Sequence, residues 1–225
     1  MKEFDHVQEP WWNDRPIIII GYGASLKDQD ISRLKGLGYV IAVKGMMFDI
    51  DWADVGFGID LPRLREWTDR FANLPFPVWW AVPEDKGVKD GRRPGNLNLL
   101  RRMRDAALGD MTDAVFCGGT SGFGALVFAW LKIGPRKRGA EIYLFGFDYQ
   151  STNGEWHVNP NHYGMRRVQR SNTWSDWAKR FRAISRQFIR AKVMVWNCSP
   201  DSVIGCFPKM TFDEAVARLS EKAKR

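Results

Sequence analysis

Cysteine and histidine are scarce in this chain, and it has no long hydrophobic run. The three cysteines Cys117, Cys198 and Cys206 are odd in number and have no metal-ligand spacing, so we expect neither a disulfide framework nor a zinc site. No apolar run approaches the roughly 20 residues that cross a bilayer. The first twelve residues, MKEFDHVQEPWW, lack the apolar core of a secretion signal. We therefore expect a cytoplasmic protein without a membrane span.

Acidic residues are outnumbered, with 26 Asp and Glu against 34 Lys and Arg, which gives a formal net charge of +8. The excess lies in residues 86–104 and 166–192, where seven and nine basic side chains face one acid each. Such segments neutralise a polyanion and release its counterions, or they form only the solvated face of a helix. We interpret them as a DNA-binding feature and assign backbone contacts to Arg92, Arg93, Arg166 and Arg167.

Strand-like and helical patterns alternate along the 225 residues, which is typical of a parallel sheet covered by helices. The fold class that we expect is α/β, a single Rossmann-like domain over residues 1–225 with one doubly wound, mostly parallel sheet. A polar stretch at 150–173 is expected to form a lid-like loop, mobile together with 84–95. The expected strands are 17–20, 39–44, 55–60, 78–82, 114–117, 141–145 and 193–197, and the expected helices are 64–74, 97–108, 125–133, 174–192 and one N-capped by Thr211.

The strand at 17–20 is followed by the turn Gly21-Tyr22-Gly23-Ala24-Ser25. Glycines and a small hydroxyl residue at a helix start present backbone N–H groups to an anion, although two glycines after a strand also occur in a plain tight turn. No acidic residue ends the second strand, where Lys44 stands instead, and this favours a phosphate-bearing ligand over NAD. We assign donor binding to Gly21, Tyr22, Gly23, Ser25 and Lys44.

Two further polar turns follow strands. The first, C-G-G-T-S-G-F-G, offers the hydroxyls of Thr120 and Ser121 and the close backbone approach of Gly122, and we assign all three to the donor. The second, G-F-D-Y, places Asp148 after a buried strand, as a catalytic residue or as an ordinary N-cap or turn residue. Because parallel strands end at the same edge of a sheet, we expect these turns to mark the ligand site.

In order and spacing, these motifs resemble the bacterial lipo-oligosaccharide sialyltransferases. The clan of that family includes motility-accessory glycosyltransferases and an archaeal-type pterin diphosphokinase, and phage proteins carry similar sequences. The resemblance extends over nearly the whole chain and rests on G-Y-G-A-S-L-K-D-Q-D at 21–30, T-S-G-F at 120–123, E-I-Y-L-F-G-F-D-Y at 141–149 and N-C-S-P-D-S at 197–202.

The resemblance implies an inverting, metal-independent transfer from a nucleotide-sugar, which serves as co-substrate, with no cofactor. It also implies that both glycine turns hold the nucleotide, and that Tyr149 and Tyr163 assist the leaving phosphate. The family's asparagine after the second strand corresponds to Lys44, and its catalytic histidine falls near Gln169 or Arg170.

A replacement base is expected among the histidines, because imidazole is suited to proton transfer near neutral pH. His157 and His162 lie in the long loop after Asp148, and Asp60 at the end of the third strand is a further candidate. We expect a glycosyltransferase that acts on hydroxymethylated pyrimidines in DNA, in the host cytoplasm if phage-encoded. The alternatives are a glycan sialyltransferase, a diphosphokinase using ATP and Mg²⁺, and a non-catalytic nucleotide- or DNA-binding protein.

Overall fold

The computed structural model describes residues 4–7, 15–84, 93–105, 107–108, 111–134, 138–151 and 171–224, with no side-chain description for 171–173. The chain divides into two compact units. The first comprises Met1–Trp12 and Val40–Arg136, and the second comprises Asn13–Tyr39 and Lys137–Arg225. Each unit is described by itself below.

Five neighbouring strands, all paired in parallel, form the sheet of the first unit. They run in the order β6-β5-β4-β3-β2. The strands are β2 (Tyr39–Val43), β3 (Val55–Gly58), β4 (Val78–Val82), β5 (Leu97–Met103) and β6 (Ala114–Phe116). A 3-10 helix, η3 (Lys44–Phe48), follows β2, and the two longer helices are α1 (Leu61–Phe71) and α2 (Ser121–Ile133).

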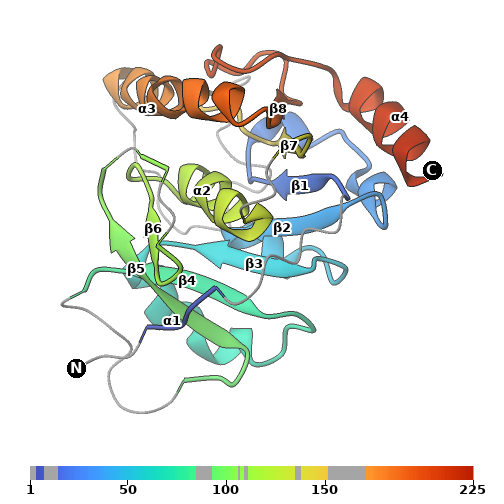
Figure 1. Cartoon of the computed structure of the whole chain (residues 1–225). Helices are drawn as coiled ribbons and strands as arrows, with labels where there is room; N and C mark the ends of the chain where they lie inside the picture. Colours follow the sequence, from blue (N-terminus) through green and yellow to red (C-terminus); the bar gives the residue numbers. More distant parts are fainter. Residues whose placement is uncertain are drawn as a thin grey trace. The chain divides into compact units, whose positions relative to one another are not determined.

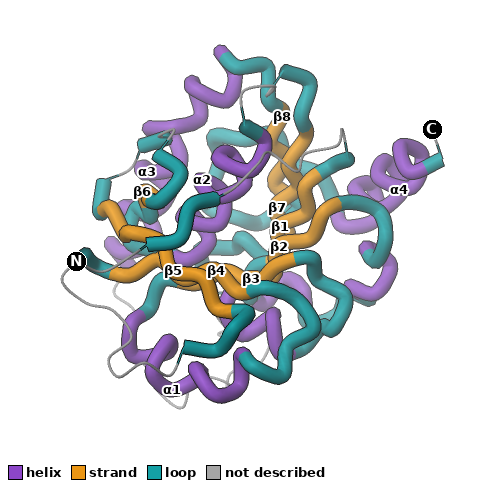
Figure 2. Tube along the Cα trace, turned by 60° about the horizontal axis from the view of Figure 1, so that its bottom comes forward, coloured by secondary structure: helices purple, strands orange, loops and turns teal. Residues whose placement is uncertain are grey.

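Two adjacent tryptophans on β4 show that α1 and α2 cover opposite faces of this sheet. Side chains alternate across a strand, so Trp79 and Trp80 point to different sides. The ring of Trp79 lies 5.6 Å from that of Phe128 on α2, whereas the ring of Trp80 lies 6.2 Å from that of Trp67 on α1. Figures 1 and 2 show the two helices on either side of the strands.

Three parallel strands form the sheet of the second unit, in the order β1 (Ile17–Ile20), β7 (Glu141–Phe145) and β8 (Met194–Asn197). The four isoleucines of β1 are fully buried. Two 3-10 helices, η1 (Ala24–Leu26) and η2 (Ile31–Leu34), follow β1, and the longer helices are α3 (Ser171–Arg190) and α4 (Phe212–Ala223). Thr211 and Glu214 form a capping box at the start of α4, which confirms the expected N-cap.

The predicted fold class is confirmed, because the described elements form a Rossmann-like α/β architecture and every strand pairing reported above is parallel. One expected element is wrong. Residues 97–108 were expected to be a basic helix, yet Leu97–Met103 is strand β5, paired to β4 and to β6. Backbone pairing on both sides overrides the helical preference of leucine and arginine. The single domain and the lid stay predictions, and residues 85–92 and 152–170 lie outside the described part of the chain.

Candidate functional site

In the first unit, a cation and a carboxylate meet where β2 and β3 end. Lys44 directly follows β2 with a left-handed backbone, at a φ of 56°, which is uncommon for a residue other than glycine. Its Nζ forms an ion pair with Asp60, the residue before α1. The side chains of Lys44 and Asp60 are 27% and 40% exposed, so a ligand can reach the pair. Asp60 makes no side-chain cap to α1, which leaves its carboxylate to Lys44.

A second cation reaches the same strand end from β5. The Nη1 of Arg102 donates a hydrogen bond of 3.0 Å to the carbonyl oxygen of Ile59, the residue next to Asp60. The neighbouring Arg101 forms an ion pair with Asp113 instead, with 2.7 Å between Nη2 and the carboxylate. Arg102 is half-buried. The end of β3 therefore carries one carboxylate and two cationic side chains.

The start of α2 faces this strand end. Gly124, in the first turn of α2, leaves no room for a side chain, since a Cβ there would lie 2.9 Å from Phe57 and 3.4 Å from Ile59. The hydroxyl of Thr120 caps the helix by accepting the N–H of Phe123 at 3.1 Å. The helix begins at Ser121 and not at residue 125 as expected, because this cap and the preceding left-handed glycines set its first turn.

Ser121 is the first residue of α2, and its side chain is the unusual feature of this helix start. The residue is only 5% exposed, and its hydroxyl has no hydrogen-bond partner in the part of the chain that the structure describes. A buried hydroxyl without a partner is costly to stability. At a helix N-terminus, which favours anions, this group is suited to donate to a bound phosphate.

In the second unit, the turn at 21–25 lies against the end of β7. Asp148, only 3% exposed, accepts the N–H of Ser25 at 2.7 Å through Oδ2 and the hydroxyl of Ser25 through Oδ1. Gly23 has to be glycine, because a Cβ would lie 2.7 Å from the Asp148 carboxylate and 2.6 Å from the oxygen of Gly146. The G-Y-G motif therefore permits close approach to the G-F-D-Y turn.

Ser199, from the N-C-S-P-D-S stretch, completes this polar cluster. Its Oγ accepts the N–H of Phe147 at 3.1 Å and lies 3.4 Å from Oγ of Ser25. Its own N–H donates to Oδ1 of Asn197, which is fully buried. Three stretches on which the family resemblance rests thus meet in one hydrogen-bonded cluster. Sequence reasoning assigned no role to Ser199, and the motif N-C-S-P-D-S was the signal that pointed to it.

Three of the N–H groups of the turn at 21–25 are already used within the protein, in contrast to the expectation that the turn presents them to a ligand. Gly21 and Gly23 donate their N–H groups to the oxygens of Phe145 and Gly146 at 2.7 Å and 3.0 Å, and the N–H of Ser25 is taken by Asp148. The following helix is only the three-residue η1. For these three groups the expectation is wrong, because backbone oxygens and the Asp148 carboxylate already accept their N–H groups.

Tyr149 adopts a left-handed backbone, at a φ of 52°, directly after Asp148. Its ring packs edge-to-face against Phe181 and Trp177 of α3, with centroids 5.2 Å and 5.8 Å away. Trp174 adds a third contact at 6.4 Å. The ring is thus held by α3 beside the Asp148 cluster, and its role toward a leaving phosphate stays a prediction.

Several predicted site residues lie outside the described part of the chain, namely His157, His162, Tyr163, Arg92, Arg166 and Arg167. Arg93 is described, and its guanidinium forms an ion pair with Asp5 and donates to the carbonyl oxygen of Leu97. The turn at 21–25 belongs to the second unit, whereas the turn at 120–122 belongs to the first. Their joint binding of one nucleotide stays a prediction.

Comparisons with protein-family models, curated proteins and solved structures found no match. Among the described residues, no helix combines the length and the hydrophobicity that crossing a bilayer requires. Within the same residues, no three His, Cys, Asp or Glu side chains are grouped so that they hold a metal ion.

Proposed function

We propose that this chain is a nucleotide-sugar-dependent glycosyltransferase whose donor phosphates bind at the start of α2. The observation that carries the proposal is the buried hydroxyl of Ser121, which has no hydrogen-bond partner among the described residues and lies at a helix N-terminus that faces a strand end with two cations. A helix N-terminus favours negative charge, and a guanidinium forms directional bonds with phosphate oxygens. Lys44 and Arg102 supply the positive charge.

The reaction transfers a sugar from phosphate to a hydroxyl. The acceptor oxygen forms a bond to the anomeric carbon while the bond from that carbon to the phosphate oxygen breaks, and its electron pair passes to the phosphate. Lys44 and Arg102 stabilise the negative charge that develops on this leaving group. The acceptor proton passes to a base, and His157 and His162 remain the proposed residues for that step.

Among the acids of the described residues, Asp60 is the alternative base. Its carboxylate is 40% exposed and is paired with Lys44, a cation that a donor phosphate would compete for. Asp148 is less suited to this role, because both of its carboxylate oxygens accept hydrogen bonds from Ser25 and the residue is buried.

DNA carrying hydroxymethylated pyrimidines is the proposed acceptor, and the net charge of +8 supports a polyanionic substrate. The similarity of the chain's motifs to the sialyltransferase family supports the chemistry of transfer but does not select the acceptor. A glycan acceptor is the second candidate within the same reaction class.

Ligand-induced stabilisation tests the donor site directly. We expect one of UDP-, CMP- or GDP-linked sugars to raise the Tm, because a ligand at about 100 times its Kd stabilises the fold by about 2.7 kcal/mol. Ser121→Val and Arg102→Gln should each abolish that rise, whereas Arg65→Gln, at an exposed position of α1, should not. The proposal fails if no nucleotide-sugar shifts the Tm of the wild-type chain, or if the three variants respond alike.

A further inference from the structure

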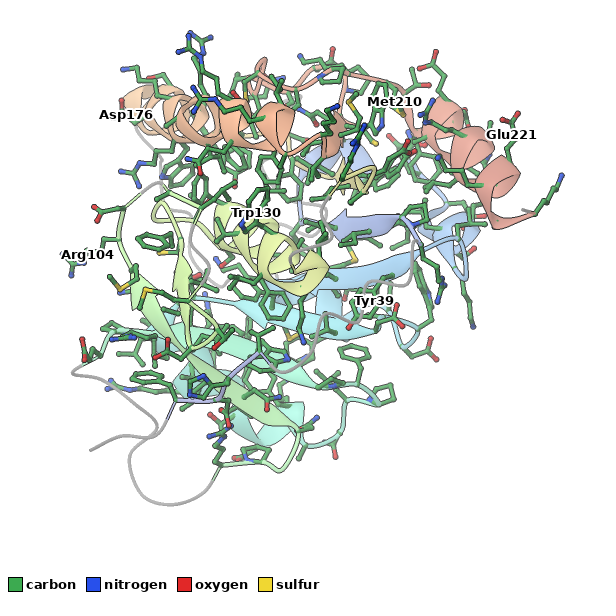
Figure 3. The ribbon with its side chains drawn as sticks, viewed as in Figure 1. Tyr39, Arg104, Trp130, Asp176, Met210 and Glu221 are labelled. Atoms are coloured by element: carbon green, nitrogen blue, oxygen red, sulfur yellow. The ribbon has the colours of Figure 1, made fainter. Side chains whose placement is uncertain are left out.

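The outer face of α3 carries a row of three exposed arginines. Arg182, Arg186 and Arg190 follow one another at four-residue steps, and all three are exposed. Four residues of α-helix advance about 6 Å and turn only about 40° past a full circle, so the three guanidinium groups project from one side. In Figure 3, Asp176 lies near the start of this helix.

No acid is available to these arginines on their own helix, since Asp176 is its one acidic residue. Asp176 is already paired with Lys179, with a distance of 3.2 Å between Oδ1 and Nζ. In the described part of the chain, no residue forms an ion pair with Arg182, Arg186 or Arg190. Among the described residues, no ion pair therefore compensates the positive charge of α3 between Arg182 and Arg190.

Two ordinary explanations for basic residues on a helix do not cover this row. Cations are favourable in the last turn, where the negative end of the helix dipole lies, but this concerns Arg190 alone. A solvated helix face usually pairs its cations with acids three or four residues away. The sequence has no Asp or Glu at those spacings from any of the three arginines.

The opposite face of α3 argues against a membrane surface as the partner of this row. Phe181, Ile184 and Phe188 are buried at 1% exposure or less, so the apolar side of the helix is already used in the core. Helices that lie in a bilayer surface bind it strongly when they insert an apolar face beside their basic one. On the described part of α3, Ile189 is the one large hydrophobic residue that is clearly exposed, at 70%.

We infer that Arg182, Arg186 and Arg190 bind the phosphate backbone of a nucleic acid. Guanidinium groups pair with phosphate oxygens through two parallel hydrogen bonds, and such contacts position a protein without reading sequence. The inference deepens the proposed function, on which its choice of duplex DNA rests, because an enzyme acting on a DNA base needs a surface that holds the backbone. It concerns α3 alone and uses no residue of the donor site.

The test is binding of the full chain to a fluorescein-labelled duplex of mixed sequence, followed by anisotropy over a series of salt concentrations. One variant combines Arg182→Gln, Arg186→Gln and Arg190→Gln. The control combines Lys35→Gln, Arg65→Gln and Lys224→Gln, which removes the same charge from exposed positions elsewhere. Each lost phosphate contact should reduce the slope of log affinity against log salt by about 0.9.

We expect the α3 variant to lose about 2.7 of that slope and the control to keep nearly all of it. The inference is overturned if the wild type does not bind the duplex at low salt, if both variants lose affinity equally, or if the row binds phosphatidylserine vesicles but not DNA. Donor-induced Tm shifts, measured on the same proteins, distinguish a failure of the DNA-binding inference from a failure of the proposed function. Retained DNA binding without any donor response would support the inference and reject the glycosyltransferase.

Discussion

Both carboxylate oxygens of Asp148 accept hydrogen bonds from Ser25, one from its backbone N–H at 2.7 Å and one from its hydroxyl. The two residues are 123 positions apart, and Asp148 is almost completely buried. A charged acceptor in a dry environment strengthens its hydrogen bonds, and removing it leaves the donors without a partner. The pair therefore fixes the turn after β1 to the end of β7.

Asp148→Asn should cost about 2–3 kcal/mol of the free energy of unfolding, because an amide cannot accept both bonds and the buried donors lose a charged partner. Urea unfolding followed by tryptophan fluorescence measures this. Asp30 offers a matched control, since it accepts the N–H and the hydroxyl of Ser32 at 3.1 Å and 2.5 Å on the exposed surface. Asp30→Asn should cost much less, and equal losses would contradict the role given to burial.

Gly23→Ala should destabilise the fold by about 1–3 kcal/mol, since its methyl group would meet a backbone oxygen and the Asp148 carboxylate at less than 3 Å. Gly205→Ala is the control in the same unit, because nothing lies within 4 Å of its added Cβ. Differential scanning calorimetry compares the two Tm values. A Gly23→Ala variant as stable as Gly205→Ala would show that the turn moves away from β7 at little cost. If Gly23→Ala is destabilised as expected, larger side chains at Gly23 will also disturb folding, and such variants cannot report on donor binding alone.

Local pattern predicted much of the fold. Four isoleucines followed by glycine were sufficient to place β1, and the apolar run at 78–82 was sufficient to place β4. The prediction of a helix at 97–108 was wrong for a physical reason. Leucine and arginine are compatible with a helix and with a strand, and pairing with β4 and β6 favours the strand. Both pairing strands lie outside residues 97–108, so the local sequence of that segment does not contain them.

The same limit applies to the candidate site. Sequence alone identified Ser121 and Lys44 as residues of interest. The burial of the Ser121 hydroxyl without a partner among the described residues, and the ion pair of Lys44 with Asp60, follow from how separate segments pack. The carboxylate that fills the first glycine turn could not be foreseen for this reason. The motif predicted N–H groups that meet an anion, and the structure shows that the N–H of Ser25 meets the Asp148 carboxylate.

Lys132, on α2, should make stability depend on alkaline pH. It is 4% exposed, its Nζ lies 5.1 Å from the ring centroid of Trp79, and burial lowers its pKa to about 8. In the unfolded chain the pKa is about 10.4, so the unfolded state binds more protons between pH 8 and 10.4. Stability should therefore rise with pH across this window and be constant below it with respect to this group.

Lys132→Met should remove that rise and raise the free energy of unfolding at pH 7, by on the order of 2 kcal/mol, because the buried charge is replaced by an apolar side chain of similar length. Urea titrations from pH 7 to 10.5 test both effects, and the two proteins should approach each other in stability at the upper end. Lys35→Met, at an exposed position, controls for the loss of charge. A wild-type profile that is flat above pH 8 would contradict the lowered pKa.

Transfer activity should survive excess EDTA, because the proposed site neutralises the leaving phosphate with Lys44, Arg102 and the α2 terminus. Release of the nucleotide from the preferred donor, with and without the chelator, measures this. An absolute requirement for Mg²⁺ would instead favour the ATP-dependent diphosphokinase, in which Asp60 or Asp148 serves as a metal ligand. A parallel assay for AMP formation from ATP distinguishes that reaction.

The base should be His157 or His162, since imidazole is the side chain best suited to accept a proton at neutral pH. Replacing the base by alanine should lower kcat by about 100-fold or more and leave the donor-induced Tm shift unchanged, because a base acts chiefly in the transition state. His6→Ala is the control, as the Nδ1 of His6 lies 2.9 Å from the hydroxyl of Thr112 in the first unit. If the His157 and His162 variants both retain near-wild-type kcat, the histidine assignment is wrong. Asp60→Asn then becomes the informative variant, because Asp60 is the accessible carboxylate beside Lys44, whereas Asp148 is committed to Ser25.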